Sequence, residues 1–195
     1  MRPGWVVPVI GAALSGVLSS GLTAAYLRST EKPETVAVDV PRDITPEQRH
    51  LAALLIAPAA PFTGTGPGKP VDTTTLAGLS TLGFVRGWTQ KWRTPDKQTV
   101  DAFVLEFAEP AGADSYARGL GNAATLLTRP RAFSVTGVPG AGGVLDTVAD
   151  KDGNFASLVV MRKGVRAVLL VLATRSPAAG ALELAQRQWA ALSAA

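Results

Sequence analysis

The chain has 195 residues, enough for one domain with appended segments and a buried core. Its net charge of +4 comes without the concentrated patch of Lys and Arg that nucleic-acid-binding domains carry, so we expect no nucleic-acid partner. The absence of cysteine excludes disulfides, thiolate catalysis, Cys-ligated zinc and lipid attachment through an N-terminal Cys.

The first predicted element is an apolar segment from Trp5 to Leu27 without a charged residue. As a helix it extends roughly 35 Å at about 1.5 Å per residue, which is enough for a hydrocarbon core of about 30 Å. We expect a cytoplasmic tail over 1–4 and a transmembrane helix over 5–27, so that the C-terminal part of a single-pass protein lies outside the cell membrane. Small residues near the end of the segment leave an alternative, a signal sequence that is cleaved before secretion.

The small residues Gly11, Ser15 and Ser19 recur at every fourth position of this helix. Such a ridge lets two helices approach closely, so it predicts a homodimer through the transmembrane helix. Residues 28–44 are polar, contain prolines and lack helical periodicity, which indicates an extended tether.

Residues 45–195 show the alternating patterns of one α+β domain with a mainly antiparallel sheet packed by helices. A helix begins at Thr45-Pro46-Glu47-Gln48, a capping-box pattern, and runs to about Ala57. The Pro- and Gly-rich stretch 58–70 is expected to be a loop. Further helices are expected over 74–82, 111–127 and 177–193, and strands over 84–93, 99–108, 132–138, 143–148, 155–162 and 165–173, the last of them central and covered on both sides.

The strand over 84–93 (FVRGWTQKWR) carries the candidate binding residues. In strand geometry one face holds Phe84 together with Arg86, Trp88, Gln90 and Trp92, while Lys91 and Arg93 point the other way. Aromatic rings stack on sugars and guanidinium groups bind acids, so Arg86, Trp88, Gln90 and Trp92 form a candidate site for an envelope glycan or a protein partner. The alternative is that the tryptophans are core residues beneath the C-terminal helix, near Trp189.

Four segments, "GF…GW…W", "PAGADSYARGL", "VTGVPGAGG" and "AQRQWAAL", resemble small envelope-facing domains of actinobacteria. These domains are similar to the lipoproteins of the LpqN class, which have a Mog1/PsbP-like α+β fold. The resemblance covers roughly residues 45–195 and implies an extracytoplasmic binding or sensing module with no catalytic residues. The chain departs from the lipoprotein pattern in lacking the lipobox cysteine, and a membrane helix stands in its place.

Two sequence motifs are compared with known ligand-binding loops, and neither fits. GTGPGKP (64–70) has Pro70 where a Walker A loop needs Ser or Thr, which predicts a flexible loop. DKDGN (150–154) has Val148 and Val159 at positions where an EF-hand needs ligands, which predicts a hairpin turn. No cofactor and no metal site are therefore predicted.

Three functions follow from these patterns. The first is a membrane-anchored extracytoplasmic binding or sensing domain of the cell envelope without catalysis. The second is an envelope hydrolase that uses His50, the single histidine, with Ser or carboxylate partners. The third is a structural subunit of a membrane complex. The missing catalytic motifs favour the first.

Overall fold

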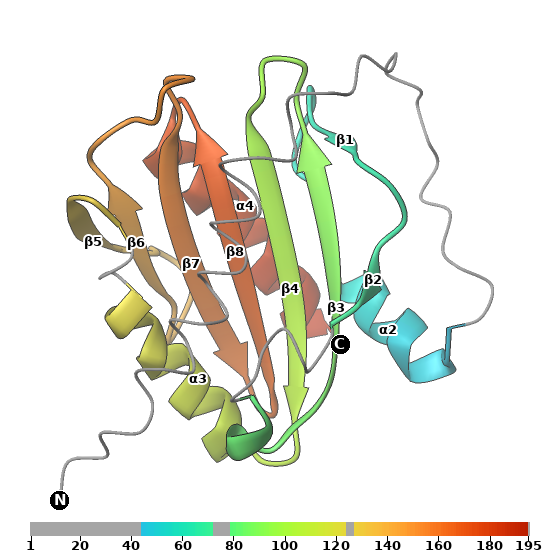
Figure 1. Cartoon of the computed structure of the whole chain (residues 1–195). Helices are drawn as coiled ribbons and strands as arrows, with labels where there is room; N and C mark the ends of the chain where they lie inside the picture. The colour runs from blue at the N-terminus through green and yellow to red at the C-terminus, as the bar shows by residue number, and fades with distance from the viewer. Residues whose placement is uncertain (1–43, 72–78, 124–126, 195) are drawn as a thin grey trace, which may run out of the picture.

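A computed structural model of the chain describes residues 44–71, 79–123 and 127–194. In this part, eight strands form one antiparallel sheet, with four helical segments against it (Figure 1). The elements in chain order are α2 (Pro46–Leu54), β1 (Thr63–Gly64), β2 (Lys69–Pro70), η1 (Ser80–Leu82), β3 (Phe84–Arg93), β4 (Thr99–Phe107), α3 (Pro110–Ala123), β5 (Pro130–Ser134), β6 (Gly142–Asp146), β7 (Phe155–Lys163), β8 (Arg166–Thr174) and α4 (Pro177–Ala194).

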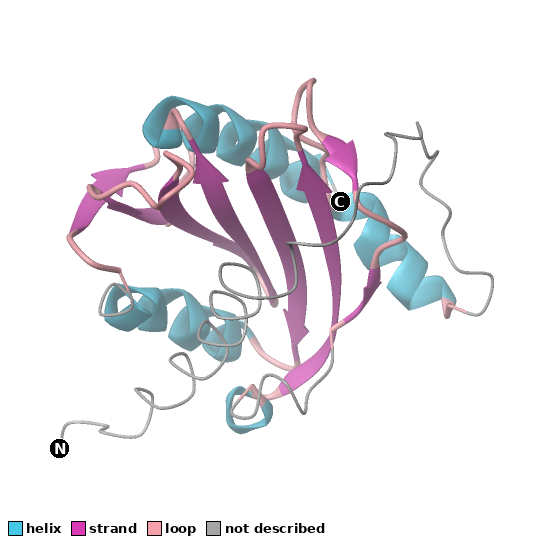
Figure 2. Ribbon diagram, turned by 45° about the horizontal axis from the view of Figure 1, so that its top comes forward, coloured by secondary structure: helices cyan, strands magenta, loops and turns pink. Residues whose placement is uncertain are grey.

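The strand order is β1-β3-β4-β8-β7-β6-β5, and β2 also pairs with β3. Helices α4 and α3 lie on opposite sides of the sheet (Figure 2), which confirms the predicted α+β class with a mainly antiparallel sheet. The expected tail (1–4), transmembrane helix (5–27) and nearly all of the tether (28–44) lie outside the described residues. Among the helices that are described, none has the length and hydropathy of a membrane span.

Helix α2 begins as its capping box predicts. The Thr45 hydroxyl accepts a hydrogen bond from the Gln48 N–H at 3.2 Å, and Gln48 Oε1 accepts one from the Thr45 N–H at 3.0 Å. Together these bonds satisfy two backbone donors that a helix start leaves open. The helix ends at Leu54, three residues before the predicted end, because Leu55 adopts an extended conformation.

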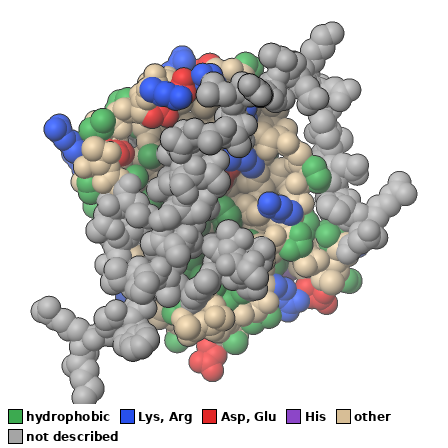
Figure 3. Space-filling model, in the orientation of Figure 1, with side chains coloured by type: hydrophobic (Ala, Val, Ile, Leu, Met, Phe, Trp, Pro, Cys, Tyr) green, Lys and Arg blue, Asp and Glu red, His purple; other side chains and the backbone are tan. Residues whose placement is uncertain are grey.

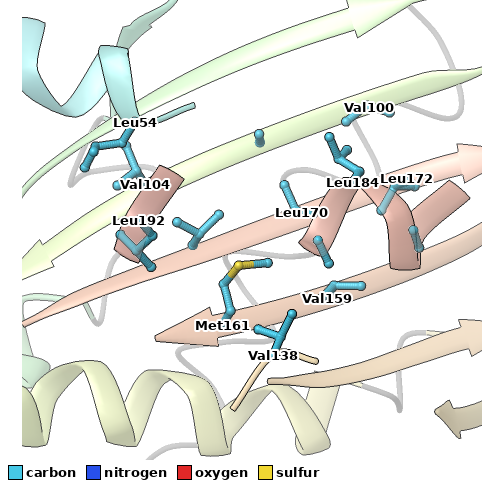
Figure 4. Close-up of a cluster of buried hydrophobic side chains, with 14 of the residues drawn as sticks. Leu54, Val100, Val104, Val138, Val159, Met161, Leu170, Leu172, Leu184 and Leu192 are labelled. Carbon is cyan, nitrogen blue, oxygen red and sulfur yellow. The ribbon is translucent and has the colours of Figure 1, made fainter. Parts of the chain in front are cut away.

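Strand β8 lies between β4 and β7, and its residues from Ala167 to Leu172 are buried, as its continuous apolar sequence predicts. On one side of the sheet, alternate residues of the strands pack with α2 and α4 in the larger hydrophobic cluster (Figure 4). The residues between them form a second cluster on the other side, which is covered in part by α3.

Two predictions about the segment before β4 are wrong. The Pro- and Gly-rich stretch forms two short strands, because β3 has a free edge on which β1 and β2 can pair. Phe84 does not share the face of Trp88: the register shifts between Phe84 and Arg86, and the Phe84 ring packs edge-on against Phe107, 6.2 Å away, in the α3-side cluster.

Other boundaries also differ from the prediction. Of the predicted helix over 74–82, residues 74–78 lie outside the described part, and η1 is a short 3-10 turn. Strand β5 ends at Ser134 because a backbone bond from Val138 to Val135 closes a turn there, and both valines are buried in the α4-side cluster.

Candidate functional site

Strand β3 places three of the four predicted binding residues in the core. Trp88, Gln90 and Trp92 share the α4 side of the sheet and are 2%, 6% and 5% exposed. Both tryptophans belong to the cluster that also contains Leu184 of α4. This burial agrees with the alternative that the tryptophans are core residues. Arg86, on the same face, is the only one of the four that is partly exposed, and the ligand-binding role of the set stays a prediction.

The GTGPGKP stretch covers this part of β3. Gly68 is buried against the Trp88 ring, so closely that a Cβ on Gly68 would lie 2.3 Å from Trp88 Nε1. Gln90 Nε2 donates to the Gly66 carbonyl oxygen at 2.9 Å. The GTGPGKP segment, which does not fit a phosphate-binding loop, therefore has a packing role and covers the side of Trp88. Position 68 requires glycine, because only a residue without a Cβ allows this close approach.

Where the sheet meets α2, the side chains that follow the buried residues along the strands are charged. Arg86, Glu106 and Arg166 occupy matching positions on the neighbouring strands β3, β4 and β8. Glu106 alternates with Leu105 and Phe107 of the α3-side cluster, so its own side chain lies on the α2 and α4 side. Cross-strand register therefore builds a row with the charge order plus, minus, plus.

Each carboxylate oxygen of Glu106 accepts from one arginine. Arg86 Nε donates to Oε1 at 2.9 Å, and Arg166 Nε donates to Oε2 at 3.3 Å. All three side chains are partly exposed, so water screens the pairs, although the shared carboxylate fixes both guanidinium groups. We call Arg86, Glu106 and Arg166, with Glu47 and His50 of α2, the charged row.

Helix α2 adds two titratable groups. Glu47 Oε2 lies 3.9 Å from Arg86 Nη1. Hydrogen bonds from its own backbone N–H and the Thr45 hydroxyl, with the charge of Arg86, lower the pKa of Glu47. His50 Nε2 lies 3.2 Å from Arg166 Nη2. Because a guanidinium can only donate, this contact is a hydrogen bond when Nε2 is the acceptor, that is, in the tautomer that carries its proton on Nδ1.

The charged row contains both Arg86 and His50. Sequence analysis had placed Arg86 in a candidate binding site and His50 in a hydrolase hypothesis. Sequence reasoning missed Arg166 and the role of Glu106 as the centre of the row. The signal for Glu106 is present in the hairpin of β3 and β4, since counting back from the turn pairs it with Arg86. Arg166 reaches the row through pairing of β4 with β8, which are far apart in the chain.

The opposite face of β3 has separate charges, as the alternation predicts. Lys91 Nζ lies 3.1 Å from Asp101 Oδ2 on β4. Burial raises the pKa of the Asp101 carboxyl, and the Lys91 ammonium opposes that rise. At one end of the sheet Lys97 pairs with Asp152 and Arg175 with Asp96, and basic and acidic side chains lie next to each other along the upper edge of the face in Figure 3.

The DKDGN segment is a turn, as predicted. Asp150 Oδ1 accepts from the N–H groups of Asp152 and Asn154 at 2.8 and 2.9 Å, and Gly153 has φ +79°. These bonds occupy the carboxylate within its own loop. In the described part of the chain, no three His, Asp or Glu side chains are grouped closely enough to hold a metal ion.

No protein-family model and no curated protein matches the sequence. Among solved structures, the chain is similar to the extracellular domain of PknH from Mycobacterium tuberculosis, with a TM-score of 0.59 at 12% identity. The match covers 76% of this chain and 97% of the PknH chain, so the two share a fold over nearly the whole of that domain. The resemblance to the LpqN class in particular stays a prediction.

Proposed function

We propose that residues 45–195 form a non-catalytic extracytoplasmic domain that binds or senses a component of the cell envelope. In this proposal residues 5–27 hold the domain at the membrane and 28–44 form the tether. The fold likeness to a domain named as extracellular supports the location. The apolar, uncharged sequence from Trp5 to Leu27 supports the anchor.

The charged row is the surface that best suits a ligand. Two guanidinium groups, from the strands on either side of β4, converge on the single carboxylate of Glu106 near the protein surface, and this is the observation that carries the proposal. A guanidinium has five N–H donors, and the contacts with Glu106 use one nitrogen of each arginine. The remaining donors suit a carboxylate or phosphate group of an envelope polymer. Trp88 and Trp92 lie further along the same face of β3, in the core.

Binding of defined probes tests the site. The full-length chain in membranes is incubated with peptidoglycan fragments that carry carboxylates, with inorganic phosphate and with a neutral glucan. We expect the acidic probes to bind and the glucan not to bind, and Arg86→Gln or Arg166→Gln to weaken binding about tenfold or more, since a hydrogen bond to a charged group contributes about 1.5–3 kcal/mol.

Arg118→Gln on α3 is the matched control, because it removes the same charge from an exposed site outside the row. Equal binding by the control and by Arg86→Gln would show that the row is not the site. Failure of every acidic probe to bind the wild-type chain would refute an acidic ligand.

Catalysis by His50 is the less supported alternative. Its Nε2 faces the Arg166 guanidinium, which is neither a nucleophile nor a base at neutral pH. A triad would instead place a hydroxyl at that nitrogen. Loss of ester, peptide or glycan hydrolysis in His50→Ala, with Arg118→Gln active, would restore the hydrolase hypothesis.

A further inference from the structure

The two edges of the sheet differ in how far their backbone groups are paired. At one edge β1 and β2 pair with β3 and cover much of its length. At the other edge lies β5, and within residues 44–71, 79–123 and 127–194 no strand pairs with its outer side. Four of its five residues are exposed and Phe133 is partly buried. An exposed edge strand presents unpaired backbone groups that another strand can bind.

The register identifies the backbone groups that face outward. The Thr147 N–H donates to the Arg129 carbonyl oxygen at 3.1 Å, and Arg131 and Phe133 lie two and four residues further along β5. Hydrogen-bonded positions alternate in an antiparallel pair, so Arg131 and Phe133 bond to β6. The N–H and C=O groups of Ala132 and Ser134 therefore point away from the sheet. The C=O group of Pro130 points the same way.

We propose that this edge pairs with β5 of a second copy of the chain, antiparallel and centred on Ala132. The two Ala132 residues then exchange two hydrogen bonds, and each Ser134 N–H donates to the Pro130 carbonyl of the other copy. Because Pro130 has no N–H, the carbonyl of the opposite Ser134 has no backbone partner. It is the one outward-facing backbone group of each copy that the pairing leaves unbonded. The arrangement is self-complementary, as a twofold interface must be.

The side chains fit the same pairing. Centring on Ala132 places Arg131 of one copy opposite Phe133 of the other, twice, so that a guanidinium lies against an aromatic ring. Phe133 is held for this contact by Gly143 on β6, where a Cβ would lie 2.4 Å from the ring. The two Arg131 residues are diagonal neighbours at about 7–8 Å, and their repulsion is screened by salt.

This contact is small beside the roughly 1,200–2,000 Å² that stable complexes bury. The dimer is therefore weak in dilute solution and forms when copies share a membrane, where the effective concentration is high. It is a contact of the extracytoplasmic domain and is separate from the predicted pairing of the transmembrane helices. It also goes beyond the proposed binding function, because it does not involve the charged row.

Single cysteines test the register, since the chain has no cysteine of its own. In a hydrogen-bonded antiparallel pair the Cα atoms are about 5.5 Å apart, within the range for a disulfide. We expect full-length Ala132→Cys to oxidise to a dimer in membranes at least about tenfold faster than Ala190→Cys, an exposed control on α4. Arg131→Cys mixed with Phe133→Cys should crosslink better than either alone. Equal rates at 132 and 190 would overturn the proposal.

The variant Ala132→Pro distinguishes a loss of dimerisation from a loss of the fold. The Ala132 N–H does not bond to β6, so proline there is expected to leave the unfolding transition of the monomer nearly unchanged. In that background the 131–133 crosslink should fall to the level of the control. Raising the salt concentration should increase the crosslink of Ala132→Cys, in which both Arg131 residues are kept and their repulsion is screened. A crosslink that survives Ala132→Pro, or one that salt abolishes, would refute pairing through this edge.

Discussion

Gln188 of α4 is expected to be the main polar connection between α4 and α2. The side chain is fully buried, with 0% exposed. Its Oε1 accepts from the Ile56 N–H at 3.0 Å, and its Nε2 donates to the Leu54 carbonyl oxygen, so one amide joins the end of α2 to α4. Gln188→Leu keeps the volume and removes both bonds.

The cost follows from those two bonds. Each hydrogen bond contributes about 0.5–1.5 kcal/mol, and the buried Leu54 carbonyl left without its partner costs about 1–3 kcal/mol more. We therefore expect the free energy of unfolding to fall by about 2–6 kcal/mol, and the Tm by about 4–24 °C for a domain of this size. Urea unfolding of the full-length chain, followed by tryptophan fluorescence, measures the change.

Gln186→Leu is the matched control on the same helix. Gln186 donates to the Thr136 carbonyl oxygen at 2.9 Å in an exposed position, so water replaces the lost partner and the cost should stay below about 1 kcal/mol. Hydrogen exchange at Ile56 should accelerate only in Gln188→Leu. Equal losses of stability in the two variants would refute the view that buried amide bonds fix α2.

Three further predictions concern residues elsewhere in the domain. Gly68→Ala should lower the free energy of unfolding by about 1–3 kcal/mol in urea titrations, because the added Cβ collides with Trp88, whereas Gly142→Ala, with open space around it, should cost under about 1 kcal/mol. Glu106→Gln should reduce stability only modestly at neutral pH, by about 1–2 kcal/mol, because both of its pairs are partly exposed; a larger loss by thermal unfolding would show that the row is a core element. Burial acts to raise the pKa of Asp146, but hydrogen bonds from the N–H groups of Val148, Thr128 and Arg129 outweigh it, so the folded pKa is lowered. The stability that Asp146 contributes is therefore present above its unfolded pKa of about 3.9 and is lost as the pH falls through the lower folded value, and Asp146→Asn should flatten that part of a stability–pH curve.

Local pattern was sufficient for the types of most elements. Alternation identified β3 and β4, a continuous apolar run identified β8, and the Thr45 capping box located the start of α2 within a residue. These signals work because side-chain direction in a strand and orphan donors at a helix start depend only on near neighbours. The tight turn after Arg93 also fixes the pairing of Arg86 with Glu106, so this pair of the charged row is encoded locally.

The rest of the site depends on contacts between distant segments. Glu106 meets Arg166 only because β8 inserts beside β4, and composition does not specify that order. The side of β3 that becomes core depends on α4 and on residues 64–70, so the sequence left both a ligand-binding role and a core role open for Trp88 and Trp92. Within residues 63–70, two short strands form in a Pro- and Gly-rich sequence because β3 supplies partners. The Lys91 carbonyl, for example, accepts from the Thr65 N–H at 3.1 Å between the two strands.

The position of α2 ties the proposed site to the proposed anchor. The proposed tether, 28–44, directly precedes Thr45, and the first turns of α2 supply Glu47 and His50 to the charged row. An acidic ligand that takes donors from Arg86 and Arg166 competes with these two side chains, while Gln188 keeps the far end of α2 fixed to α4. Binding at the row would therefore act on the near end of the helix, the end next to the proposed tether and anchor. A sensor needs such a connection between ligand and anchor, whereas a passive binding module does not. Hydrogen exchange over α2, measured with and without peptidoglycan fragments, therefore distinguishes a sensor from a passive binding module.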